Sequence, residues 1–130
     1  MRKRGQALAE MAAVMGVLIA LALGGVNLGQ AMLASYTLNQ AAREAAHQAA
    51  ITGGDNQRAT AVAQAVIAAG VGMEVRQANI QVACQRNPCR RYDPITVTIR
   101  YQSEFWAPIP GLSRFSLSAN ATRASERDRQ

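Results

Sequence analysis

An uncharged, apolar run near the N-terminus constrains the fold of this chain more than any other feature. From Met11 to Gly29 no side chain is charged, and Asn27 is the one strongly polar residue of the run. About twenty such residues are enough to cross the hydrocarbon core of a bilayer as an α-helix. We therefore predict a transmembrane helix, with the two ends of the chain on opposite sides of a membrane.

The charges that flank this run predict its orientation. Arg2, Lys3 and Arg4 form a compact positive cluster before it. Lys and Arg beside one end of a membrane helix hold that end in the cytoplasm. We expect a single-pass protein of the cytoplasmic (inner) membrane with its N-terminus inside and its C-terminus outside. Everything after about residue 35 then lies beyond the membrane.

Glu10 is the unusual residue of this segment, because it lies at the edge of the apolar run. A charged side chain costs roughly 2.5 to 3.5 kcal/mol at the centre of a membrane helix, and less near the interface. One interpretation is that Glu10 lies at headgroup level and is hydrated. The other is that its carboxylate pairs with a cation that proteolytic processing creates.

Three segments carry a resemblance to a known family. Residues 4–11 read RGQALAEM, and a Gly followed by four residues and a Glu resembles the cleavage motif of class III prepilins. The same residues resemble the opening of the TadE-like family, minor pilins or pseudopilins of tight-adherence (Tad/Flp) pilus systems. Residues 37–46, TLNQAAREAA, are similar to that family's Asn-Ala-Ala-Arg-Glu segment, although Ala45 stands where Gly is usual and His47 where Arg is frequent. Residues 95–101 and 117–123 are similar to its closing strands.

The resemblance implies a processing step and a set of partners. A prepilin peptidase would cut after Gly5, so that Gln6 becomes the new N-terminus and Glu10 the fifth residue of the mature chain. In pilins of this kind that Glu neutralises the N-terminal amine of a neighbouring subunit. The implied partners are the peptidase, other pilins and Tad assembly components. The implied role is pilus assembly and surface adherence, with a final location in the pilus, the periplasm or the cell surface.

The fold that we expect is α+β, with the outline of a lollipop, as in pilin-like proteins. No proline precedes Pro88, and residues 30–51 are mostly good helix formers, so we predict one helix from about Ala7 to Ile51. In its outer half, apolar residues recur near helical spacing, namely Met32, Leu33, Tyr36, Ala41, Ala45 and Ala49. The predicted divisions are a leader (1–5), a transmembrane half (6–29), an outer half (30–51), a small head (52–124) and a charged, frayed tail (125–130).

Beyond the long helix the pattern predicts a small head. Gly53 or Gly54 suits the left-handed position that ends a helix, and Asp55 or Asn56 suits the cap of the next. The second helix is expected over about 57–69, with Val62, Val66 and Ile67 on one face. Strands are expected over about 74–84, 95–101 and 115–122, and the proline-containing stretch 106–111 is expected to be a loop. The three strands predict an antiparallel meander packed on the outer half of the long helix.

Small residues recur four apart in the membrane half of the long helix. Spacing of this kind lets helices approach closely in lipid, but an Ala- and Gly-rich helix also produces it by chance. The residues concerned are Ala12, Gly16, Ala20 and Gly24, followed by Gly25 and Gly29. Asn27 is expected either to hydrogen-bond a neighbouring helix or to lie near the interface.

The two cysteines predict a structural disulfide. Cys84 and Cys89 flank Asn87-Pro88, a turn signal, and an extracytoplasmic domain lets thiols oxidise. Redox-active pairs usually have two residues between the cysteines rather than four. A structural zinc site needs four ligands, and two Cys with one His are too few, so we expect no metal.

The remaining composition favours a structural protein over an enzyme. The only histidine, His47, has no nucleophile beside it, and the sequence contains no phosphate-binding loop, so we expect no catalysis and no cofactor. The net charge is +6, and the densest basic cluster outside the leader is Arg86, Arg90 and Arg91. Such a cluster can contact nucleic acid or anionic polymers. We interpret it instead as a solvated surface and expect no nucleic acid partner.

Two other functions stay open at this stage. The chain can be a permanently anchored envelope protein that is never cleaved, whose head binds a partner or a surface polymer. It can also be an exported protein with an ordinary signal peptide, because Ala20-x-Ala22 offers a cleavage site. Glu10 near the start of the apolar region is unusual for a signal peptide.

Overall fold

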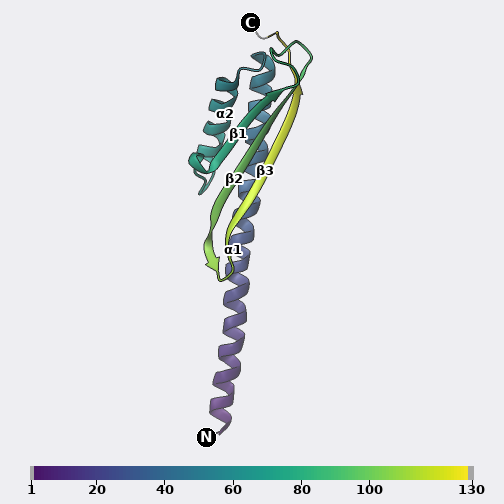
Figure 1. The fold of residues 1–130 in the computed structure, drawn as a ribbon. Helices are drawn as coiled ribbons and strands as arrows, with labels where there is room; N and C mark the ends of the chain where they lie inside the picture. Colours follow the sequence, from purple (N-terminus) through teal and green to yellow (C-terminus); the bar gives the residue numbers. More distant parts are fainter. Residues whose placement is uncertain (1, 129–130) are drawn as a thin grey trace.

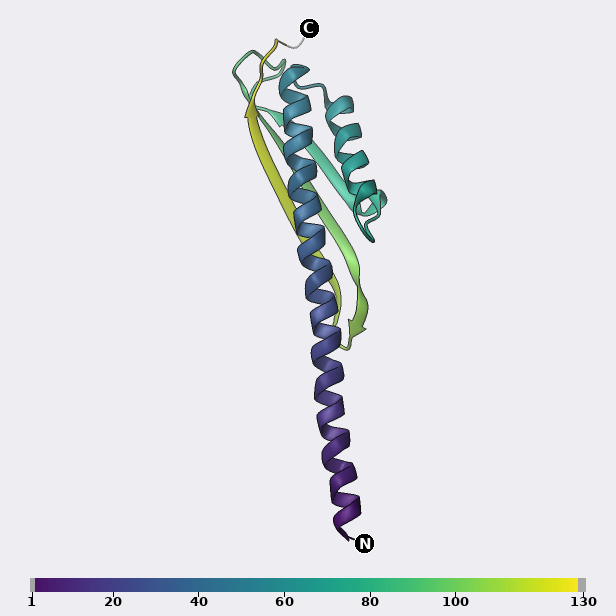
Figure 2. The ribbon, with the colours of Figure 1, turned by 180° about the vertical axis from the view of Figure 1, so that it is seen from behind.

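The computed structural model describes residues 2–128, with side chains from residue 5 onward, and is organised along one helix. Helix α1 (Arg2–Ile51) has 50 residues and is therefore about 75 Å long. We expected it to begin at about Ala7, but it begins at Arg2. It ends at Ile51 as predicted. Figures 1 and 2 show that its lower half projects alone, while all other elements gather along its upper half. The predicted α+β class and the pilin-like outline are confirmed.

Helix α1 ends at the predicted Gly-Gly pair. Gly53 and Gly54 have φ of 69° and 83°, in the left-handed region, and the Gly54 amide donates to the Ala49 carbonyl at 2.8 Å. Position 54 is also crowded, because an added Cβ would lie 3.3 Å from the Cβ of Cys89. Glycine therefore satisfies both the backbone turn and the close approach of the cysteine loop.

Helix α2 (Asn56–Ala69) runs back along α1. Its cap is Asp55, whose carboxylate accepts from the amides of Gln57 at 3.0 Å and Arg58 at 3.3 Å. The buried face of α2 is formed by Ala59, Ala63 and Ile67. Of the expected face, Ile67 is buried, but Val62 and Val66 are only half-buried, because the small alanines face α1 and let the two helices approach closely.

The sheet is a three-stranded antiparallel meander in the order β1-β2-β3, as predicted. Its strands are β1 (Ala78–Cys84), β2 (Pro94–Ile109) and β3 (Leu112–Ala124). The first strand is shorter than expected, since a turn of 3-10 helix (Val75–Gln77) replaces its first residues. As expected, one face of β2 is buried and the other carries Thr96, Thr98 and Arg100; the buried residues are Ile95, Val97, Ile99 and Tyr101.

The expectation of a loop at 106–111 is wrong. Strand β2 continues through Trp106 and Pro108 to Ile109, and the chain reverses over Pro110-Gly111, where Gly111 has φ of 86°. Pairing with β3 is irregular between Glu104 and Ile109, so Pro108 lies where the ladder does not need its missing amide. Two side chains of α1 bond the backbone of this stretch instead, as described below.

The core lies between the sheet and an alanine-rich face of α1. This face includes Ala41, Ala42, Ala45, Ala46 and Ala49, all fully buried, with Leu38 at its lower end. The expectation that Met32, Leu33 and Tyr36 share this face is wrong. These three residues are exposed, because their positions at about 100° per residue turn them away from the sheet.

The C-terminal segment is not frayed over residues 125–128. Ser125 is buried, and its amide and carbonyl bond the backbone of Asp93 and Tyr92. The Glu126 amide donates to the Ala50 carbonyl at 2.8 Å, which satisfies one of the last carbonyls of α1. The Asp128 carboxylate accepts from the Arg91 amide at 2.8 Å. Residues 129 and 130 lie outside the described residues.

Candidate functional site

The motif at the base of α1 is fully helical and exposed. Gly5, Gln6 and Glu10 lie in the first turns, and the Gln6 side-chain amide donates to the Glu10 carboxylate at 3.2 Å. Residue 6 and Glu10 therefore share one face of the helix, one turn apart. An added Cβ at Gly5 would meet nothing within 4 Å, so packing within the chain does not require a glycine there. The side chains of Arg2, Lys3 and Arg4 lie outside those described.

The lower half of α1 exposes large apolar side chains around most of its circumference. Helix α1 is long and apolar enough to cross a membrane, and only 6% of its most apolar 18-residue window is buried. The core helix of a soluble protein would be mostly buried. The exposed large hydrophobic residues of this half are Leu8, Met11, Val14, Met15, Val17, Leu18, Ile19, Leu21, Leu23, Val26 and Leu28.

The small residues of α1 divide between two faces. At about 100° per residue, Gly16, Ala20 and Gly24 lie on the same side as the buried Asn27 and continue the head-facing side downward. Gly25 and Gly29 lie on the opposite side. An added Cβ at Gly16, Gly24, Gly25 or Gly29 would meet nothing within 4 Å, so the packing of this chain alone does not require them.

Two buried amides join α1 to the lower end of β2. Asn27 donates to the Ala107 carbonyl at 2.7 Å and accepts from the Ala107 amide at 3.1 Å. Gln30, one turn higher, donates to the Glu104 carbonyl at 2.9 Å and accepts from the Trp106 amide at 2.8 Å. The two side chains thus replace strand pairing where β2 departs from β3. We call Asn27 and Gln30 the amide pair.

The amide pair corrects the expectation that Asn27 bonds a neighbouring helix, since its partner is a strand of the same chain. The other expectation, that Asn27 lies near the membrane interface, stays a prediction. The sequence signal was two amides three residues apart on the apolar helix, which places them on one face. The spacing shows that the two amides share a helix face, but it does not show which segment of the chain they bond. The partner is about 80 residues away in sequence.

The predicted disulfide is present. Cys84 and Cys89 are bonded, with their Cα atoms 5.8 Å apart, and they join the end of β1 to the loop before β2. Asp93 lies close to both sulfurs, and these three residues resemble a metal-ligand group by distance alone. Both sulfurs are already used in the disulfide, so the group has no thiolates to offer a metal. The buried Asp93 carboxylate instead accepts from the Arg90 amide at 3.0 Å.

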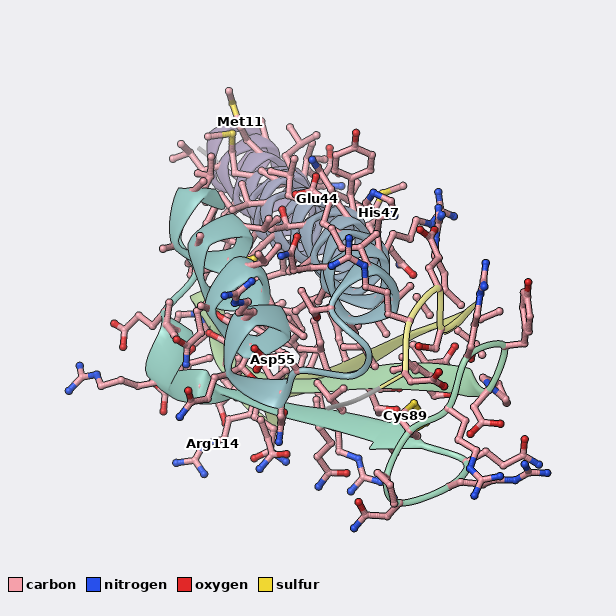
Figure 3. All side chains as sticks on the ribbon, turned by 90° about the horizontal axis from the view of Figure 1, so that it is seen from above. Met11, Glu44, His47, Asp55, Cys89 and Arg114 are labelled. Atoms are coloured by element: carbon pink, nitrogen blue, oxygen red, sulfur yellow. A yellow bond between two sulfur atoms is a disulfide. The ribbon has the colours of Figure 1, made fainter. Side chains whose placement is uncertain are left out.

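The other singled-out polar residues are dispersed over the surface. Arg86, Arg90 and Arg91 are exposed in the β1–β2 loop, and the Arg91 guanidinium lies 5.0 Å from the centre of the Tyr92 ring. Seen along α1 in Figure 3, Glu44 and His47 lie on the side away from the sheet, while Arg114 lies on the outer face of the sheet. These residues do not gather into one charged site.

A known family matches most of helix α1. A family model described as TadE-like protein matches residues 5–47, about a third of the chain, and confirms the resemblance over that range. TadE-like proteins are a structural, non-enzymatic family, and the match indicates a protein associated with a Tad pilus, a membrane and other pilus components. The similar strands at 95–101 and 117–123 lie beyond the matched residues. No match was found among curated proteins or among solved structures.

Proposed function

We propose that this chain is a minor pilin or pseudopilin of a Tad-type pilus. It is held in the cytoplasmic membrane with its N-terminus inside, cut by a prepilin peptidase after Gly5, and needed for pilus assembly and surface adherence. The observation that carries the proposal is the position of Gly5 and Glu10 at the free end of an exposed apolar helix, within the residues that match the TadE-like model.

Cleavage after Gly5 gives the Glu10 carboxylate a suitable partner. Cleavage would create a new amine at Gln6, one turn from Glu10, whose carboxylate already accepts from the Gln6 side chain at 3.2 Å in the uncleaved chain. When helices pack side by side, Glu10 is withdrawn from water and needs a cation. A buried charge without its partner costs several kcal/mol, whereas a buried pair is tolerated. The amine of a neighbouring subunit provides the cation without adding a charged side chain.

The surface of α1 fits side-by-side packing. Its two small-residue faces, Gly16-Ala20-Gly24 and Gly25-Gly29, lie on opposite sides, so one helix can receive close neighbours on both. Apolar exposure continues above the membrane half through Met32 and Tyr36, on the side away from the sheet. In a filament, packing between subunits would cover these side chains.

The first experiment is to determine the N-terminal residue of the protein from its host by intact mass. A start at Gln6 supports the proposal. A start at Met1 would instead support the alternative function, an uncleaved envelope protein whose head binds a partner or a surface polymer. A start just past Ala22 would indicate an exported domain, and the proposal would fail.

A glycine pair tests the processing step. Gly5→Ala should slow cleavage, because the peptidase would meet a Cβ at its cleavage site, and the uncut chain should accumulate on a mass or mobility assay. Gly16→Ala is the matched control, since an added Cβ at either position meets nothing within 4 Å of the folded chain. Equal cleavage of the two variants would contradict processing at Gly5.

A glutamate pair tests assembly. Glu10→Ala should leave membrane insertion intact but reduce pilus number and surface attachment. Glu44→Ala is the matched control, because Glu44 also accepts from a Gln four residues earlier, Gln40, at 3.0 Å. Normal piliation by the Glu10 variant would exclude the proposed pairing.

A further inference from the structure

The turn between β2 and β3 carries exposed apolar residues at the lower end of the head. We call residues 106–112 the hairpin tip. Among the described residues outside α1, the exposed large hydrophobic side chains are Val71, Tyr92, Trp106 and Leu112, so half of them lie in the tip. Trp106 is 49% exposed and Leu112 is 53% exposed. Exposed apolar residues that gather at one place, rather than lie singly, mark a surface for contact.

The charge pattern isolates the hairpin tip. From Phe105 to Ser113 no side chain is charged. Immediately above this stretch, Glu104 and Arg114 face each other across the two strands at 3.5 Å. Uncharged apolar residues therefore occupy the end of the hairpin, and an ion pair marks where charge begins. The part of α1 beside the tip is also uncharged, since α1 carries no charge from Met11 to Ala42.

The amide pair fixes the height of the tip along α1. Twenty-two residues separate Gly5 from Asn27, a rise of about 33 Å, against about 30 Å for the hydrocarbon core of a bilayer. Asn27 holds Ala107, and Gln30 holds Trp106, so these residues lie near the outer edge of the hydrocarbon. Figures 1 and 2 show the turn below this point, nearer to the N-terminus of α1 than any other part of the head.

The side chain of Trp106 suits that depth. An added Cβ at Gly72 would fall on the Trp106 ring, so one side of the indole packs against the turn after α2 while the other side remains open. This turn contributes Val71, which is also exposed. Tryptophan prefers the membrane–water interface, where its ring lies among apolar groups and its N–H meets water or headgroups.

We propose that the hairpin tip is a second membrane contact, which places Trp106 at the headgroup boundary of the outer leaflet and inserts Leu112 just below that boundary, beside α1. The occupant of this surface is lipid, since the tip is uncharged and lies at the height where the exposed apolar face of α1 leaves the hydrocarbon. The inference rests on the proposed bilayer placement of residues 6–29. The contact fixes the tilt and rotation of the head while the subunit is stored in the membrane, and extraction into a pilus releases it.

Trp106 is the only tryptophan of the chain, so its fluorescence reports the tip directly. The full chain is reconstituted in vesicles of three parts phosphatidylethanolamine to one part phosphatidylglycerol, containing lipids with a nitroxide at the headgroup or at mid-chain. We expect strong quenching of Trp106 by the headgroup label, weaker quenching by the mid-chain label, and a blue-shifted emission. Trp106 that is quenched by neither label would overturn the proposal.

Three single-tryptophan variants in a Trp106→Phe background complete the test. Leu112→Trp should also be quenched and blue-shifted, with a larger share of its quenching from the mid-chain label than the wild type, because Leu112 lies deeper than Trp106. This variant covers the case that the smaller ring in this background alters the packing on Gly72. Tyr92→Trp, at an exposed aromatic in the β1–β2 loop whose amide donates to the Ser125 carbonyl just beyond the end of β3, should be quenched several-fold less. Ile19→Trp should be quenched most by the mid-chain label, because it reports the helix itself.

The Ile19 probe separates the two possible failures. If it is quenched at mid-chain while positions 106 and 112 are unquenched, the tip contact is refuted and the membrane helix stands. If position 19 is also unquenched, the bilayer placement fails and the tip contact fails with it. Blue-shifted emission at the tip that depends on the protein-to-lipid ratio without lipid quenching would indicate contact between copies of the chain, and would also overturn the proposal.

Discussion

Above and below Asn27, α1 uses apolar residues in opposite ways. Below, it exposes large side chains such as Leu18 and Ile19 and places small residues on its head-facing side. Above, it buries small alanines against Ile95, Val97 and Ile99 and leaves Met32 and Tyr36 exposed. The backbone is the same continuous helix throughout. What differs is whether the chain itself covers the apolar surface.

The comparison shows that the size of apolar residues, and not only their hydrophobicity, separates the two halves. Alanines at positions such as 41, 45 and 49 let the sheet and α2 approach the α1 backbone closely, which builds a dense core from a small head. The apolar surface of the large exposed side chains in the lower half is not covered by the chain itself. Under the proposed function, lipid and the helices of other subunits cover this surface.

Truncation of one isoleucine to alanine in each half should give the largest difference in unfolding free energy between the halves. Ile99→Ala removes a fully buried side chain and should lower the free energy of unfolding by about 2–5 kcal/mol. Ile19→Ala, at a site that is 55% exposed, should change it by less than about 0.5 kcal/mol. Denaturant unfolding of the full chain in micelles, followed by Trp106 fluorescence, measures both. Equal losses would show that the lower half also supports the head.

An asparagine pair tests where the boundary between the halves lies. Asn27→Ala leaves the amide and carbonyl of Ala107 without their partner and should cost about 1–3 kcal/mol. Asn39→Ala removes only an exposed bond to the Ser35 carbonyl and should cost less than about 0.5 kcal/mol. The same unfolding experiment applies, and hydrogen exchange at Ala107 should accelerate only in the Asn27 variant. An unchanged exchange rate there would place the boundary higher on α1.

A glycine pair should give effects of opposite sign. Gly54→Ala forces an L side chain into φ of 83° next to Cys89 and should cost about 1–2 kcal/mol. Gly16→Ala adds a Cβ in open space within a helix and should leave the stability of the head unchanged, while it favours the helix itself by up to about 1 kcal/mol. Thermal unfolding of the head measures the first effect, and helical circular dichroism measures the second. A destabilised head in the Gly16 variant would contradict the independence of the lower half.

The smallest expected effect concerns α2, which belongs only to the upper half. Asp55→Ala removes the acceptor for the amides of Gln57 and Arg58 and should cost about 1 kcal/mol. Asp55→Asn keeps a capping oxygen and should restore most of that loss, which distinguishes capping from the exposed ion pair with Arg58. The unfolding midpoints of the wild type and the two Asp55 variants distinguish these two contributions. Identical midpoints for the Ala and Asn variants would assign the effect to charge.

Local pattern was enough to predict most elements of the fold. Helix formers without proline predicted α1, the Gly-Gly-Asp sequence predicted its end and the cap of α2, and strict alternation predicted the buried face of β2. For the site, the Gly5–Glu10 spacing and the cysteine pair could be recognised directly. All of these features involve residues that are close in sequence.

Local sequence patterns were misleading where a distant partner decides the structure. Pro108 and Pro110 indicated a loop, but the amide pair of α1 bonds the backbone around Trp106, so β2 continues. Residues 125–128 read as a charged, frayed end, but the Ala50 and Asp93 carbonyls bind them. Met32 and Tyr36 were assigned to the core because their spacing suits a helix face, and spacing alone does not show which face the sheet covers.

The attachment of the head to α1 has a mechanical consequence. At the lower end Asn27 and Gln30 bond β2, and at the upper end the Ala50 carbonyl bonds Glu126 just beyond β3. A tensile load applied along α1, as in a filament under tension, therefore reaches the head at both ends and acts in shear on many bonds at once. A head attached at one end only would peel away one bond at a time. The chain should accordingly keep its head attached under forces that align its helix.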